Sequence, residues 1–130
     1  MNEINNLDDG LPSTVSTFQI DIVGKVTKKR YLGEFTSKIP TIKDQIDIAK
    51  HEAYLNGQYS AFLDESVRQV NKKIAYLRFV LSDSPKFWKD SDLGYLLRDQ
   101  NVIDAIYTEV LSLEEKWYSK IWGTDESEEK

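Results

Sequence analysis

The side chains that most often do chemistry at neutral pH are scarce in this chain of 130 residues. It has one histidine, His51, no cysteine, and glycines such as Gly33 and Gly57 that are too isolated to form a phosphate-binding loop. His51 lies one turn beyond Asp47 on a predicted helix, but a metal site needs about three or four ligands. We therefore expect His51 to be a solvated residue on a helix surface, and we predict no metal and no cofactor.

Two pairs of neighbouring acidic residues are the other candidates for acid–base chemistry. They are Asp90 with Asp92 and Glu114 with Glu115. A catalytic carboxylate needs an apolar pocket that raises its pKa, and nothing in the sequence predicts one. We expect both pairs to be solvated and the protein not to be an enzyme. A metal-dependent hydrolase or nuclease, using His51 or Asp47, is a disfavoured alternative.

A basic cluster surrounds a predicted turn and consists of Lys25, Lys28, Lys29 and Arg30. Such a cluster could contact nucleic-acid phosphates or an acidic protein. No basic stripe continues from it along a helix, and no aromatic residues are interleaved with it as in single-strand binders. A solvated loop tip or a protein contact is therefore favoured over nucleic-acid binding.

Length and composition indicate one domain with polar ends. The two ends of the chain carry more negative charge than the net −5, and the middle of the chain is nearly neutral. We expect a flexible segment at 1–17, a single domain at 18–123 and a disordered acidic tail at 124–130. No apolar stretch approaches the ~18 residues of a membrane helix, and the start of the chain lacks signal-peptide features, so we expect a cytoplasmic protein.

Alternating apolar residues predict two strands near the start of this domain. Phe18, Ile20 and Ile22 alternate with polar residues, and Tyr31 and Phe35 flank Gly33 with the same period. A polar break between the two runs indicates an antiparallel hairpin. Helices must cover one of its faces because a lone hairpin is marginal in water, and its free edge is a template for pairing with another strand.

Three main helices are predicted after the hairpin. The first spans 42–55, begins at a capping box formed by Thr41 and Asp44, and ends at Gly57; its apolar residues at helical spacing are Ile42, Ile46, Ala49 and Ala53. The second follows 60–64, with the stripe Val67, Val70, Ile74, Leu77 and Leu81. It ends at Ser82–Pro85.

A short helical turn is expected within 91–99, and a long third helix spans 102–121 and ends at Gly123. The fold class is therefore α+β, an N-terminal antiparallel β-hairpin packed on a small bundle of three main helices. The stripe of the second helix can pack within one chain or between two chains, so the oligomeric state stays open.

Tryptophan and tyrosine are frequent, and both are enriched in protein-interface hot spots. Trp117 lies on the apolar stripe of the third helix, so we expect it to be buried. Phe87 and Trp88 lie in a connector, where they either plug the end of the bundle or form an exposed anchor. Tyr118 and Trp122 lie beside the stripe, near the end of the helix.

Two segments resemble the tail assembly chaperones of tailed phages. Tyr31, Gly33, Phe35 and Lys38, followed by a helix that opens after Pro40, match the family pattern y-x-G-x-F-x-x-K. The helical run 74–81 and the following segment 84–88 are similar to the family's helix and Pro-x-x-Trp segment, after which a final helix is usual. The resemblance covers roughly residues 18–122.

The resemblance implies a transient assembly factor in the host cytoplasm. Such a protein binds the long helical tape-measure protein, keeps it soluble and recruits tail tube subunits. Helix-in-groove contact is the expected mode, and the candidate anchors are Phe87, Trp88, Tyr118 and Trp122. The alternative is a structural virion protein of the tail or baseplate, which would use the same residues in a permanent interface.

Overall fold

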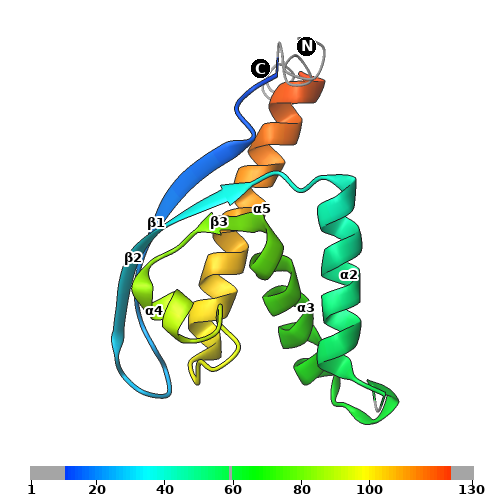
Figure 1. Cartoon of the computed structure of the whole chain (residues 1–130). Coiled ribbons are helices and arrows are strands. Elements are labelled where there is room, and N and C mark those ends of the chain that lie inside the picture. The colour runs from blue at the N-terminus through cyan, green and yellow to red at the C-terminus, as the bar shows by residue number, and fades with distance from the viewer. Residues whose placement is uncertain (1–10, 59, 124–130) are drawn as a thin grey trace.

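The structure is a computed structural model and describes residues 11–58 and 60–123. Its elements in chain order are β1 (Val15–Val23), β2 (Arg30–Lys38), α2 (Ile42–Asn56), the 3₁₀ turn η1 (Ser60–Phe62), α3 (Glu65–Val80), β3 (Leu81–Asp83), α4 (Lys86–Asp90) and α5 (Gln100–Trp122) (Figure 1). The predicted α+β class, a hairpin followed by helices, is confirmed. The acidic tail predicted at 124–130 and the first ten residues of the predicted flexible segment lie outside the described residues.

The sheet has three antiparallel strands in the order β1-β2-β3. β1 pairs with β2 in a register that places Phe18 opposite Phe35 and Ile20 opposite Gly33. β1 begins at Val15, within the segment predicted to be flexible, because β2 extends to Lys38 and offers a partner that far. The third strand was not predicted, since its three residues are too short to show a period.

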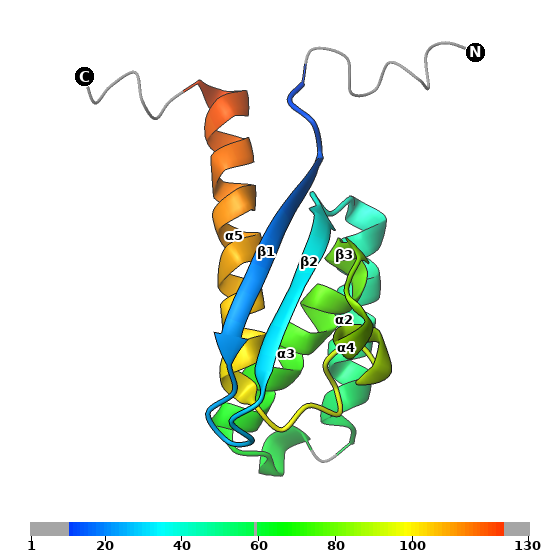
Figure 2. The ribbon, with the colours of Figure 1, turned by 90° about the vertical axis from the view of Figure 1, so that its left-hand side faces the viewer.

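One face of the sheet is covered by helices and the other is open. α3 and α5 lie behind the sheet, and α2 lies outside them, packed against α3 (Figures 1 and 2). Along β1, exposed side chains alternate with buried or half-buried ones. The buried and half-buried side chains point toward the helices, and the exposed ones point to the open face. The core is formed by Ile20, Tyr31, Phe35, Leu77, Val80, Trp88, Val102, Ile106 and Val110, among others.

The predicted helix ends largely agree with the structure. Thr41 and Asp44 form the reciprocal hydrogen bonds of a capping box at the start of α2, and Gly57 and Gly123 end α2 and α5 with φ of 69° and 63°. In α3, Val67 is 43% exposed, and Leu81, predicted to end the stripe, is the first residue of β3, so the buried stripe is shorter than predicted.

The short helix after α3 does not lie where it was predicted. α4 begins directly after Pro85, whose carbonyl accepts hydrogen bonds from the Trp88 and Lys89 N–H groups. The chain beyond it has positive φ at Asp92, Leu93 and Gly94, a conformation that a right-handed helix cannot contain. Residues 91–96 are therefore turns, and the expectation of a helical turn around Leu93 is wrong.

β2 and α4 are held together by interlocking aromatic rings. Trp88 is fully buried and meets Phe35 edge-on, with ring centroids 5.8 Å apart. Phe87 packs at 5.1 Å against Tyr31 and at 6.0 Å against Phe35. Gly33 has no side chain, and Pro85 fills the space beside it. A Cβ at position 33 would lie 2.5 Å from the Pro85 side chain. The two segments that carry the family resemblance thus meet in one packing unit.

Replacing Gly33 with alanine tests this packing unit. The added methyl must displace Pro85 and α4, and overpacking of this kind usually costs about 1–3 kcal/mol. We expect the free energy of unfolding, measured by urea titration, to fall by this amount. Glu34→Ala, at the exposed neighbouring position of β2, is the control. Equal or greater stability of Gly33→Ala would contradict the close approach of Pro85.

The hairpin turn is held by a buried carboxylate that the sequence analysis did not single out. Asp99, fully buried before α5, accepts hydrogen bonds from the backbone N–H groups of Val26 (2.7 Å) and Thr27 (2.9 Å). It also accepts from the hydroxyls of Thr27 (2.5 Å) and Tyr31 (2.8 Å). Gly24 leaves room for it, because a Cβ there would lie 2.2 Å from the Asp99 carboxyl carbon. A single carboxylate therefore joins the turn to the start of α5.

Burial alone would raise the pKa of Asp99. The hydrogen bonds from Thr27, Tyr31 and Val26 outweigh that effect and hold the pKa well below its usual range. Asp99 is therefore ionised in the folded protein at neutral pH.

Candidate partner-binding surface

The four residues predicted to bind a partner do not lie together. Phe87 and Trp88 are in α4 under the sheet, whereas Tyr118 and Trp122 are at the far end of α5 (Figure 1). Trp88 is fully buried and belongs to the core. The alternative of an exposed Trp88 anchor is therefore wrong for this fold. Phe87 is half-buried and lines a hollow of about 410 Å³ with Tyr31 and Pro85.

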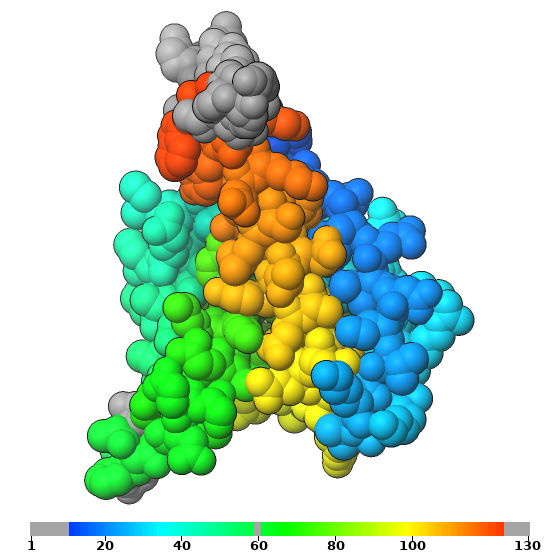
Figure 3. Space-filling model, turned by 180° about the vertical axis from the view of Figure 1, so that it is seen from behind, coloured from blue at the N-terminus to red at the C-terminus, as the bar shows by residue number. Residues whose placement is uncertain are grey.

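The end of α5 presents an aromatic cluster. Trp122 is 68% exposed and its ring lies 5.5 Å from Tyr118, which in turn meets Trp117 at 5.1 Å. Trp117 is half-buried rather than buried, and its indole N–H donates to the Pro12 carbonyl. Figure 3 shows this end of α5 projecting beyond the neighbouring helices. Trp122, and the half-buried Tyr118 beside it, are thus placed where a partner could reach them.

The outward face of α2 carries the apolar residues that marked this helix in the sequence. Its apolar residues at helical spacing, Ile42, Ile46, Ala49 and Ala53, are all exposed; Ile42 is 77% and Ile46 52% exposed. These four residues form what we call the α2 stripe. Spacing of this kind usually marks the face that a helix turns to its own core. Here it marks the face turned away from the core.

α2 is held to the rest of the protein by its other side. Ile48 is its buried residue and Leu55 is half-buried, and the helix packs against α3. α2 therefore carries apolar residues on two faces, only one of which is covered by described residues. Exposed contiguous apolar surface on a small protein commonly marks a site of protein–protein contact. Periodicity found the stripe but could not show which face α3 would cover.

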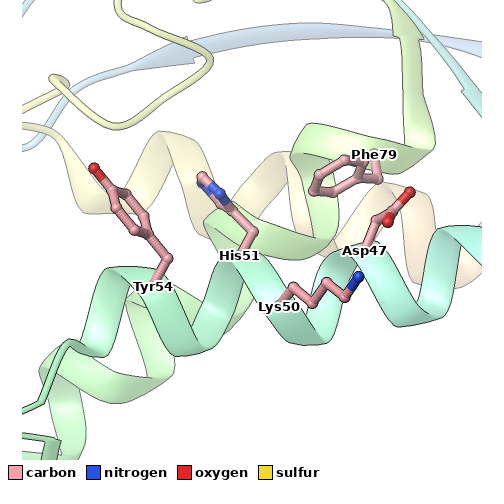
Figure 4. Close-up of a pocket in the computed structure, with 5 residues that line it drawn as sticks. All are labelled: Asp47, Lys50, His51, Tyr54 and Phe79. Carbon is pink, nitrogen blue, oxygen red and sulfur yellow. The ribbon is translucent and has the colours of Figure 1, made fainter.

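A shallow hollow of about 410 Å³ lies beside the α2 stripe. It is lined by Asp47, Lys50, His51 and Tyr54 of α2 and by Phe79 of α3 (Figure 4). The His51 ring stacks on Tyr54 at 5.7 Å and meets Phe79 edge-on at 6.0 Å. His51 is therefore half-buried rather than fully solvated, because Phe79 and Tyr54 pack against it.

The environment of His51 favours its neutral form. Burial lowers the pKa of His51, the nearby charge of Arg78 lowers it further, and Asp92 acts in the opposite direction. The buried Nε2 has no hydrogen-bond partner among the described residues. No group of three potential metal-binding side chains occurs in the described part of the chain. The hollow thus offers a neutral aromatic surface with Lys50 and Asp47 at its rim.

The two acidic pairs are placed differently from one another. Asp90 and Asp92 are exposed and form ion pairs with Lys86 (2.8 Å) and Arg78 (3.1 Å). Glu114 is half-buried on α5 and accepts a hydrogen bond from the Tyr76 hydroxyl, so the expectation that it is solvated is wrong. Burial raises the pKa of Glu114, and the bond from Tyr76 opposes that shift. Tyr76 and Glu114 join α3 to α5.

The predicted basic tip is exposed, and one of its members is paired. The Arg30 guanidinium donates two hydrogen bonds of 2.7 Å to the Asp21 carboxylate. That pairing lowers the pKa of Asp21 and raises the pKa of Arg30. Lys25, Lys28 and Lys29 lie on the turn that Asp99 holds.

Comparison with known proteins adds no family. No protein-family model, curated protein or solved structure matches this chain. Within residues 11–58 and 60–123, no helix is both long enough and apolar enough to cross a membrane.

Proposed function

We propose that this protein is an assembly factor that binds helical segments of a long tail protein, as the tail assembly chaperones of phages bind the tape-measure protein. The observation that carries the proposal is the α2 stripe. A helix laid along it would cover Ile42 and Ile46, while the small side chains of Ala49 and Ala53 allow close approach of the two backbones. In this proposal the protein acts in the host cytoplasm, keeps its partner soluble and recruits tail tube subunits.

The surroundings of the stripe suit a helical partner with a mixed surface. Lys43 and Lys50 flank one side of the stripe, and Gln45 and Glu52 flank the other. An apolar strip with a polar rim is the usual anatomy of a protein interface. Tyr118 and Trp122 offer a second contact, at the end of α5, for a partner longer than one helix. Of the four anchors predicted from the sequence, the proposal uses these two, and the buried Trp88 is not available.

Co-expression with candidate tape-measure proteins tests the proposal. Affinity capture of this chain should retain a soluble complex, and Ile46→Asp should weaken binding by about 30-fold or more because it places a charge in the centre of the contact. Leu32→Asp is the matched control, since Leu32 is 55% exposed on the open face of the sheet. Equal capture by both variants would contradict binding through the α2 stripe.

A permanent tail or baseplate subunit would use the same surface. Mass spectrometry of purified particles separates the two roles. The assembly-factor proposal expects the protein to be absent from mature particles, and stoichiometric copy number in them would overturn it.

A further inference from the structure

β1 has a free edge along its middle. Gly24 and Thr14, both at even positions, make backbone hydrogen bonds to Lys29 and Ile39 across the hairpin. In an antiparallel pair, every second residue of a strand bonds to its neighbour. In the β1–β2 register, the N–H and C=O groups of even-numbered β1 residues therefore point toward β2. The backbone groups of odd-numbered residues therefore point outward, away from the sheet.

Side chains of the same protein bond backbone groups at both ends of this edge. The Ser13 hydroxyl bonds the N–H and the C=O of Val15, and the Asn101 amide donates to the Val23 carbonyl at 3.0 Å. Between them, the outward groups of Thr17, Gln19 and Asp21 have no partner among the described residues. Unpaired backbone groups of this kind are a template for adding a strand.

We propose that this edge pairs with the β1 edge of a second copy of the chain. The two strands run antiparallel, with Gln19 of each copy opposite Gln19 of the other. Thr17 then lies opposite Asp21 of the second copy, and each opposed pair exchanges two backbone hydrogen bonds. The free groups of Thr17, Gln19 and Asp21 are all used, and Val15 lies opposite Val23 of the second copy at each end of the contact. The result is a continuous six-stranded sheet across the two-fold axis.

Side chains on the open face select this register. The arrangement brings Val15 beside Val23 of the second copy and keeps the two Asp21 carboxylates about 14 Å apart along the strands. A register centred on Asp21 would place like charges directly opposite each other, which destabilises a strand pair. A register centred on Thr17 would leave the free groups of Asp21 opposite Ser13, beyond the strand.

The inner face of the edge also gains from this pairing. Phe18 and Ile22 point toward the helices but are only half-buried, because β1 is the last strand of the sheet. In the proposed pair, Phe18 lies beside Ile20 of the second copy. α5 runs behind the sheet and past the β1 edge, so it provides a surface over which the added strand can lie (Figures 1 and 2).

The absence of cysteine from the chain makes disulfide trapping a clean test. Gln19→Cys places two cysteines opposite each other with Cα atoms about 5.5 Å apart, which a disulfide can span. Under mild oxidation we expect it to yield about tenfold more disulfide-linked dimer than Thr17→Cys, whose two sulfurs are separated along the strands. Glu34→Cys, exposed on the same face but on β2, is the matched control. Equal yields from all three variants would overturn the proposal.

Light scattering after size exclusion provides the second measurement. The wild-type protein should give the mass of a dimer at high concentration. Gln19→Pro should give a folded monomer, because it removes only an outward N–H group and proline is tolerated at such edge positions. A wild-type monomer at every concentration would also overturn the pairing. Capture of a tail protein by Gln19→Pro separates this result from the function proposed above.

Discussion

Replacing Trp88 with alanine is expected to destabilise the protein by about 3–5 kcal/mol, the usual cost of truncating a fully buried tryptophan. The ring fills the space between Phe35 and the backbone of Gly94, where a Cβ would lie 2.4 Å from the indole. Its loss leaves a cavity that α4 and the following turns cannot close without moving. The measurement is the free energy of unfolding from a urea titration followed by circular dichroism.

Trp122→Ala is the control for this prediction. Trp122 is exposed at the end of α5, so its loss should change stability by no more than about 0.5 kcal/mol. The opposite pattern, a stable Trp88→Ala variant that loses partner binding, would restore Trp88 as an exposed anchor and contradict its place in the core.

Replacing Asp99 with alanine is expected to lower the melting temperature at pH 7 by roughly 10 °C. The substitution leaves two backbone N–H groups and the hydroxyls of Thr27 and Tyr31 without their acceptor. Asp64→Ala is the matched control, since Asp64 also precedes a helix without a side-chain capping bond but is exposed. A similar small change in both variants would contradict the anchoring role of Asp99.

The pH dependence gives an independent test of Asp99. Its folded pKa is lowered, so the unfolded state takes up a proton first as the pH falls. The stability from Asp99 is fully present above the unfolded pKa of about 3.9 and is lost progressively below it. The difference in stability between wild type and Asp99→Ala should therefore be constant from pH 5 to pH 8, roughly, and shrink below about pH 4. A constant difference down to the lowest measurable pH would contradict the lowered pKa.

Local signals in the sequence were sufficient for the fold class and for most boundaries. The hairpin follows from period-two alternation, and the start and end of α2 follow from Thr41, Asp44 and Gly57, whose effects depend on neighbours within one turn. The third strand was missed because β3 is formed only where β2 offers a free edge, which is a property of the tertiary structure.

The candidate site could be predicted only in part. Trp88 and Trp122 are the same residue type outside the predicted apolar stripes, and only the packing of α4 under Gly33 and Phe35 buries one of them. The α2 stripe was found by its period, but its direction depends on Ile48 and Leu55 packing against α3. Asp99 carried no local signal, since its partners lie about seventy residues earlier in the chain.

Hydrogen–deuterium exchange is the most direct test of the central claim that the α2 stripe binds a helical partner. The protein would be measured alone and in complex with the tape-measure protein retained by affinity capture. We predict slower exchange in peptides covering 42–56 on binding, with no change in the β2 peptides around Leu32. Unchanged exchange in 42–56, with protection confined to other segments, would contradict the claim.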